Sequence, residues 1–237
     1  TTAVASTDVL AKISGYSGVS SVASNTVAYV YSASDATNSD VVTTLTSIEN
    51  ATGSDGADYI VASPAGSVIT AGAGNDFVKL GAGADTVVLS AITAAANRDT
   101  VSGFTVGTDK LTTNVTGAAA DKYAELATFT ADALTIVKGK ITELTMTLST
   151  DLSTATDGTA LLAALKAANT GTDVTLTQAN AADAQGYLVA YQGGNAYLYY
   201  YSNTATAGIA ASEIALVGVL NTITANALTS ADFGLTA

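Results

Sequence analysis

Residues Thr70–Ser90 read TAGAGNDFVKLGAGADTVVLS, and the pattern G-x-G-x-D-x-apolar-x occurs in them twice, nine residues apart. An interval of nine fits neither the 3.6-residue period of an α-helix nor the two-residue alternation of a β-hairpin. A longer fixed period is typical of a solenoid, in which each unit stacks on the one before it. The stretch therefore predicts stacked coils of short strands.

The period extends over residues 53–88, which align as GSDGADYIV, ASPAGSVIT, AGAGNDFVK and LGAGADTVV. Glycine at position four and aspartate at position six recur in the same three units. These residues are Gly56, Gly74 and Gly83, and Asp58, Asp76 and Asp85. Glycine permits the backbone angles of a tight turn, and the aliphatic eighth position suits an inward-facing strand residue. Two units then form one coil of two turns and two strands, and coils stack at about 4.8 Å.

Residues 18 apart share one edge of such a stack, so the pattern places Asp58 beside Asp76 and Ser67 beside Asp85. Stacked carboxylates repel each other, and Ca²⁺ bound by carboxylates and turn carbonyls removes that repulsion. We therefore expect Asp58 and Asp76 to flank one ion, with Mg²⁺ less suited because it prefers a small rigid octahedron. Ser67 has no charge, so its edge is expected to bind weakly or not at all, and only the first edge has two charges. The alternative is an ordinary series of Gly/Asp turns in a β-protein.

The composition excludes several classes of protein. The 237 residues include no Cys, His or Trp, so thiol nucleophiles, serine–histidine catalysis and histidine zinc sites are absent and the chain is not expected to be an enzyme. The formal net charge is −12, and eight Lys and Arg are too few for a nucleic-acid surface. No apolar run approaches the roughly 20 residues of a membrane span. Thr1–Leu10 has no basic region typical of a signal peptide, and the chain is expected to be processed or partial.

Outside the repeat, the pattern predicts a mainly β chain with a smaller α+β C-terminal region. Alternating or β-branched runs predict strands at Thr26–Tyr31, Val41–Leu45, Ile141–Leu148 and Ile214–Leu220. Helices are predicted within residues 121–129 and after Asp157, which can cap the first turn. Residues 186–191 and 196–201 flank QGGN and predict a tyrosine-rich hairpin. A soft boundary near residue 150 divides a region 1–150, with the roll at about 47–111, from a region 151–237.

On these residues the sequence resembles the RTX family, whose nonapeptide G-G-x-G-x-D-x-U-x binds Ca²⁺ in a parallel β-roll. Residues 47–53, SIENATG, resemble the lead-in before such repeats, and residues 99–111, DTVSGFTVGTDKL, resemble the segment that closes the roll. The resemblance implies that Asp99 and Asp109 are terminal calcium ligands. Residues 196–201, 214–218 and 228–233 resemble the C-terminal ending of RTX proteins, and Asp232 and Phe233 are expected to dock the C-terminus.

The resemblance also implies type I secretion through an uncleaved C-terminal signal. Acidic, Cys-free chains rich in Thr, Ala, Ser and Gly are typical of surface-layer (S-layer) proteins exported in this way. The first functional hypothesis is therefore a calcium-dependent S-layer component at the cell surface, with self-association, the type I machinery and lipopolysaccharide as its expected partners. The alternative is the export-and-folding module of a secreted enzyme, toxin or adhesin.

The tyrosines at 197, 199, 200 and 201 have two readings. They form either a stacking platform for a sugar or a packed hairpin with Tyr200 on the opposite face from the other three.

Overall fold

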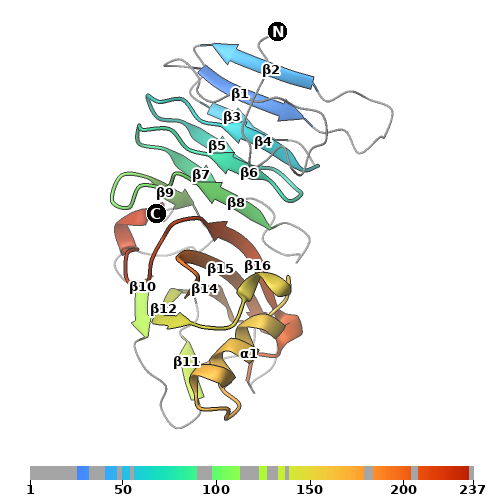
Figure 1. The fold of residues 1–237 in the computed structure, drawn as a ribbon, viewed down its shortest axis with the longest axis vertical. Helices are drawn as coiled ribbons and strands as arrows, with labels where there is room; N and C mark the ends of the chain where they lie inside the picture. Colours follow the sequence, from blue (N-terminus) through green and yellow to red (C-terminus); the bar gives the residue numbers. More distant parts are fainter. Residues whose placement is uncertain are drawn as a thin grey trace.

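The computed structural model is built mainly from β-strands in three sheets (Figure 1). It describes residues 26–31, 41–46, 50–53, 56–89, 98–112, 123–126, 133–136, 139–178, 184–203 and 208–234. The predicted fold class, mainly β with a parallel roll, is confirmed. Within these ranges no helix is long and apolar enough to cross a membrane.

The nonapeptide repeat forms a two-sheet roll. One sheet contains strands β3 (Asn50–Thr52), β5 (Val68–Thr70), β7 (Thr86–Val88) and β9 (Lys110–Thr112). The opposite strands are β4 (Asp58–Val61), β6 (Phe77–Lys79) and β8 (Asp99–Ser102). All neighbours in both sets are parallel. The first coils are related by the predicted shift of 18, as in Ile60↔Val78 and Ile69↔Val87, whereas β8 and β9 pair with shifts of 23 and 24. Of the predicted lead-in, residues 47–49 lie outside the described residues.

The eighth position of each repeat supplies the core of the roll. Ile60, Ile69, Val78 and Val87 all have 0% exposed surface, whereas their strand neighbours are mostly partly exposed. One short aliphatic residue per strand therefore fills the narrow space between the two sheets. Such a core is thin, and the ends of the roll need further covering.

The N-terminal end of the roll is covered by a hairpin. Strands β1 (Thr26–Tyr31) and β2 (Val41–Thr46) pair with each other, and β1 pairs antiparallel with β4. Both strands were predicted from their β-branched residues.

The C-terminal region continues both sheets of the roll (Figure 1). Its strands are β10 (Tyr123–Leu126), β12 (Ile141–Leu148), β14 (Ala184–Gln192), β15 (Asn195–Asn203), β16 (Ile214–Leu220) and β17 (Phe233–Gly234). Strand β16 pairs in parallel with β8, and β17 pairs in parallel with β9. The result is one ten-stranded sheet from β10 to β2 and one five-stranded sheet from β17 to β3.

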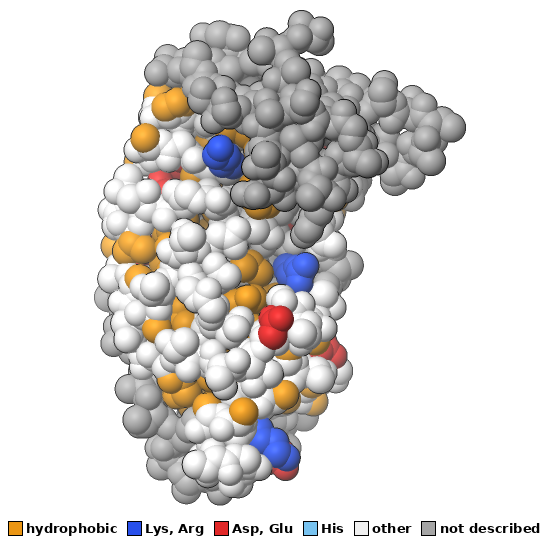
Figure 2. All heavy atoms as spheres, in the orientation of Figure 1, with side chains coloured by type: hydrophobic (Ala, Val, Ile, Leu, Met, Phe, Trp, Pro, Cys, Tyr) orange, Lys and Arg blue, Asp and Glu red, His pale blue; other side chains and the backbone are white. Residues whose placement is uncertain are grey.

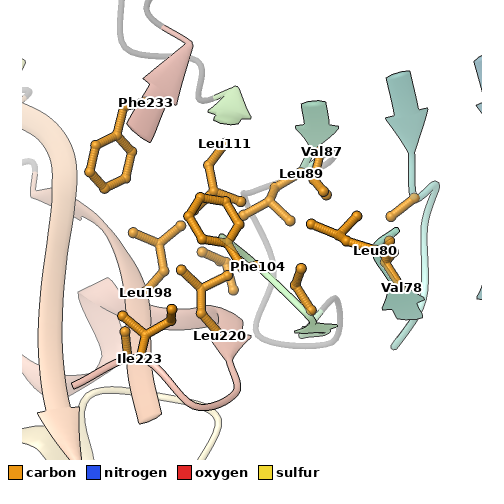
Figure 3. Packing of buried hydrophobic residues seen from close by; sticks show 14 of the residues in the cluster. Val78, Leu80, Val87, Leu89, Phe104, Leu111, Leu198, Leu220, Ile223 and Phe233 are labelled. Carbon is orange, nitrogen blue, oxygen red and sulfur yellow. The ribbon is translucent and has the colours of Figure 1, made fainter. Parts of the chain in front are cut away.

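A shared core joins the roll to the C-terminal strands. Figure 3 shows Phe104 and Leu111 of the roll facing Leu198 and Leu220, and all four belong to one buried cluster. Phe233 is 4% exposed in the same cluster, as expected for a residue that docks the C-terminus.

A second core lies on the other face of the tyrosine-rich hairpin. It is covered by α1 (Thr159–Ala168) and by the two-stranded sheet of β11 (Ala133–Ile136) and β13 (Thr175–Gln178). Short 3₁₀ turns lie at Leu152–Thr154, Ala211–Glu213 and Ser230–Asp232. The α1 helix was predicted, and the Asp157 carboxylate accepts the Thr159 N–H at 2.9 Å, although Gly158 is the N-cap residue.

The hairpin follows its predicted turn and faces. Gly193 and Gly194 both have positive φ, 60° and 79°, which suits a tight two-residue turn. Tyr197, Tyr199 and Tyr201 pack in the second core, and Tyr200 packs against the first. Tyr197, Tyr199 and Tyr201 are buried and only Tyr200 of the four is partly exposed, which agrees with a packed hairpin and leaves no row of exposed rings for a sugar.

One predicted element is wrong. Residues 123–126 form β10 and not part of a helix, because they pair in parallel with β12 over four residues. The division near residue 150 stays a prediction, and β12 on one side of it pairs with β14 on the other.

Candidate metal centre

Aspartates stand at the start of successive strands along two edges of the roll. Edge A consists of Asp58, Asp76 and Asp99, which begin or directly precede β4, β6 and β8. Edge B consists of Ser67, Asp85 and Asp109, which directly precede β5, β7 and β9. The structure thus brings together every aspartate that the sequence proposed as a ligand, in two separate rows.

The carboxylates of edge A link one coil to the next. The Asp58 N–H donates to Asp76 Oδ1 at 2.8 Å, and the Asp76 N–H donates to Asp99 Oδ1 at 3.1 Å. Asp76 is therefore the middle member of three and is bonded to both neighbours.

Edge B repeats this link and adds a second bond within each turn. The Asp85 N–H donates to Asp109 Oδ1 at 2.9 Å. Within the turns, the N–H four residues earlier donates to the side-chain oxygen, from Ser63 to Ser67, from Gly81 to Asp85 and from Thr105 to Asp109. Ser67 thus closes its turn with a neutral hydroxyl, which needs no cation.

All five aspartates are buried, with exposed fractions between 0% and 3%. Two of their oxygens, Asp76 Oδ2 and Asp85 Oδ1, are buried without a hydrogen-bond partner among the described residues. A buried acceptor with no donor is costly, and a bound cation removes that cost. Each edge therefore has one carboxylate oxygen that is free to bind a metal.

Burial also makes the charged form of these acids unfavourable. Burial raises the pKa of Asp76 to about 7, and the negative charge of Asp58 contributes. Burial raises the pKa of Asp99 to about 8, and the charge of Asp76 adds to the effect. Burial raises the pKa of Asp85 to about 6, with a further contribution from the charge of Asp109. A nearby cation acts in the opposite direction on all three.

Glycine is needed where the turns of adjacent coils touch. At Gly74, whose φ is 116°, a Cβ atom would lie 2.7 Å from the carbonyl carbon of Gly56. At Gly83 a Cβ atom would collide with the backbone nitrogen of Gly66. The predicted glycines therefore bring backbone against backbone along the same edges as the acids.

The residues present fit calcium. No group of three or more acidic side chains converges on one point among the described residues, because the aspartates follow one another along each edge. Backbone carbonyls of the glycine turns would have to complete the shell, and Ca²⁺ accepts such mixed sets of six to eight oxygens. The candidate ligands are Asp58, Asp76 and Asp99 with the turns at Gly56 and Gly74, and Asp85 and Asp109 with the turn at Gly83. A bound ion would supply the positive charge that holds stacked carboxylates together.

The structure corrects the predicted charge of edge B. The sequence predicted two charges on one edge only, but Asp109 joins Asp85 and gives edge B two acids, while Asp99 gives edge A three. The expected weakness of edge B therefore holds only at Ser67. Two polar residues that the repeat pattern did not single out also make contacts near the edges. The Asn75 side chain accepts the Arg98 N–H, and the Asp232 carboxylate accepts the Gly107 N–H at 2.5 Å.

We expect the calcium-free protein to lose stability as the pH rises from about 4 to about 8. Aspartates in the unfolded chain titrate near pH 3.9. The native state still holds protons on Asp76, Asp85 and Asp99 above that pH, so folding is favoured by acid and disfavoured as these protons leave. Denaturant midpoints measured in chelator at pH 5 and pH 8 test this.

Asp76→Asn is the control variant for this pH dependence, because the amide cannot ionise. Its midpoint should vary less with pH than that of the natural protein. With saturating Ca²⁺ the midpoint of the natural protein should instead be higher at pH 8 than at pH 5, because calcium competes with protons for the same oxygens. A calcium-free midpoint that is higher at pH 8 than at pH 5 would contradict the burial of these acids.

Comparison with known families identifies the repeat. Residues 52–87 match the family model of the RTX calcium-binding nonapeptide repeat, in four copies. Neither the curated proteins nor the solved structures gave a match to the chain. The matched segment contains Asp58, Asp76 and Asp85, and such repeats bind Ca²⁺.

Proposed function

We propose, from the RTX calcium-binding repeats at residues 52–87, that this is a calcium-dependent structural protein of the cell surface, an S-layer component exported by type I secretion. The observation that carries the proposal is the pair of buried aspartate rows, which require a cation to be stable when ionised. Calcium then acts as the signal that folds the chain after export.

Export and folding follow from the same rows of acids. Where calcium is scarce, ionised aspartates on adjacent coils repel and the roll is destabilised, so the chain remains able to thread through a secretion channel. Outside the cell calcium binds only the native state, and a concentration 100 times the Kd adds about 2.7 kcal/mol of stability. Weak sites of the extracellular kind are sufficient for this switch.

The surface-layer role is supported by composition and by the surface. The chain is Cys-free, has a net charge of −12, and contains only 12% charged residues. Figure 2 shows a face with few charged side chains, on which uncharged groups and scattered hydrophobic ones predominate. Few charges on this face mean little electrostatic repulsion between copies that pack through it, and lipopolysaccharide is the candidate anchor.

We also propose that the chain has no catalytic activity. It contains no His and no Cys, and its buried aspartates are engaged in linking coils. The negative charge and the small number of basic residues argue against nucleic acid as a partner.

Calcium is expected to increase the β-sheet circular dichroism of purified, calcium-depleted protein, and magnesium is not. The physical reason is the need for large, flexible oxygen coordination between buried carboxylates. Titration of each metal at neutral pH checks this. Equal β-signal in chelator, or an equal response to Mg²⁺, would contradict the proposal.

Electron microscopy of the purified protein separates the two functional hypotheses. Ordered two-dimensional sheets that form with Ca²⁺ and disperse in chelator are the result expected of an S-layer component. Folded but dispersed monomers in Ca²⁺ would instead favour the alternative, an export-and-folding module of a secreted enzyme, toxin or adhesin.

A further inference from the structure

The 18-residue period is broken at the last coil of the roll. Asp58 and Asp76 are 18 residues apart, but Asp76 and Asp99 are 23 apart. The chain therefore returns to edge A after an interval that the repeat itself does not set. The β6–β8 ladder, in which Phe77 pairs with Thr100, sets the register of the strands, and a contact in the preceding turn can further fix where Asp99 lies relative to Asp76.

Three consecutive residues make that return. The Arg98 N–H donates to Asn75 Oδ1 at 2.8 Å, Asp99 Oδ1 accepts the Asp76 N–H at 3.1 Å, and the Thr100 N–H donates to the Asp76 carbonyl at 2.7 Å. The bonds at Asp99 and Thr100 involve the candidate ligand and strand β8. The bond at Arg98 involves the Asn75 side chain, which has no other assigned role.

Edge B makes its equivalent return without such a side chain. The Lys110 N–H donates to the Asp85 carbonyl at 2.8 Å and the Asp85 N–H donates to Asp109, which matches edge A. The N–H of Thr108, which corresponds to Arg98, donates instead to Thr105 within its own turn at 3.0 Å. The repeat position of Asn75 is occupied there by Ala84, which has no acceptor in its side chain.

We propose that Asn75 is a positioning residue, whose amide oxygen sets the chain at Arg98 so that Asp99 completes the calcium-binding edge A. Asn75 acts through the backbone of the following coil and does not itself bind the ion. The Arg98 side chain is not part of this contact: its backbone N–H is held by Asn75, whereas its Nη1 donates to the Ser153 carbonyl at 3.4 Å. This inference rests on edge A binding calcium and is independent of the surface-layer role.

The test is a calcium titration of Asn75→Ala in a variant that also carries Asp85→Asn, so that edge A dominates the signal. Affinity is expected to fall about three- to tenfold, the range for loss of one side-chain hydrogen bond. Asn75→Asp keeps the acceptor oxygen and is expected to retain the affinity. Arg98→Ala keeps the N–H and loses only the side-chain bond to Ser153, so it serves as the matched control, with no loss of calcium affinity expected.

Two further measurements separate positioning from general destabilisation. In an Asp99→Asn background the effect of Asn75→Ala on calcium affinity should vanish, because the residue it positions is already disabled. Hydrogen exchange of the Arg98 amide should quicken in Asn75→Ala while exchange at Thr108 stays unchanged. An unchanged affinity in Asn75→Ala, or an equal loss with and without Asp99, would overturn the proposal. No calcium binding by the natural protein would instead overturn the proposed function.

Discussion

Asp76→Ala is expected to abolish calcium-driven folding at calcium concentrations that fully fold the natural protein. Asp76 is the middle acid of edge A, and its buried Oδ2 has no hydrogen-bond partner among the described residues. Its removal deletes a ligand, for which we expect at least a tenfold loss of affinity, or about 1.4 kcal/mol. It also leaves the buried Asp58 N–H without its acceptor, which costs about 1–3 kcal/mol more.

Calcium titration followed by circular dichroism measures this effect. Asp173→Ala is the matched control, because Asp173 is an exposed aspartate whose ion pair with Lys166 lies at the surface. It also removes one negative charge, and its calcium response should stay unchanged. A similar response of both variants would mean that net charge, and not edge A, controls folding.

Gly74→Ala is expected to prevent the roll from forming even with calcium in excess. The new Cβ would lie 2.7 Å from the Gly56 carbonyl carbon, a distance that real contacts do not reach, and both atoms belong to stacked turns that cannot separate without breaking the coil pairing. The φ of 116° adds strain for any residue with a side chain. We expect a loss of about 3 kcal/mol or more, as for other severe backbone conflicts.

The control for this substitution is Gly139→Ala. Gly139 also has a positive φ, 69°, but nothing lies within 4 Å of its ideal Cβ position. The loss of stability at Gly139 should be limited to the backbone strain of a non-glycine residue at positive φ, about 1 kcal/mol. Denaturant unfolding in Ca²⁺ compares the two variants. Equal losses would show that stacked turns do not limit the spacing of the coils.

The sequence predicted those parts of the site that follow from the regular nine-residue repeat. Asp58 and Asp76 share an edge because they are 18 residues apart, and Ile69 and Val87 face inward because their position repeats. Asp99 and Asp109 came only from the family resemblance, since their intervals of 23 and 24 residues break the repeat. Their place on the edges is now visible in the hydrogen bonds that they accept.

Long-range pairing could not be predicted in the same way. The parallel ladder between β8 and β16 joins Asp99 to Gly218, and neither segment carries a signal for the other. Residues 123–126 show the converse error, because a helix suggested by local residues gives way to pairing with β12. The role of Asn75 could not be predicted either. An Asn does not recur at this position of the repeat, and its partner is the Arg98 backbone N–H, 23 residues away.

The 18-residue shift between the strands of the first coils limits how the chain can change in length. Tyr59 pairs with Phe77, and Val68 pairs with Thr86. Deleting or duplicating 18 residues therefore replaces one coil by its equivalent and leaves both ends of the roll in register. A nine-residue deletion would exchange the two edges and place the N-terminal hairpin against the wrong sheet. Natural variants of this molecule should therefore differ by whole coils, much as other repeat proteins gain or lose whole units during evolution.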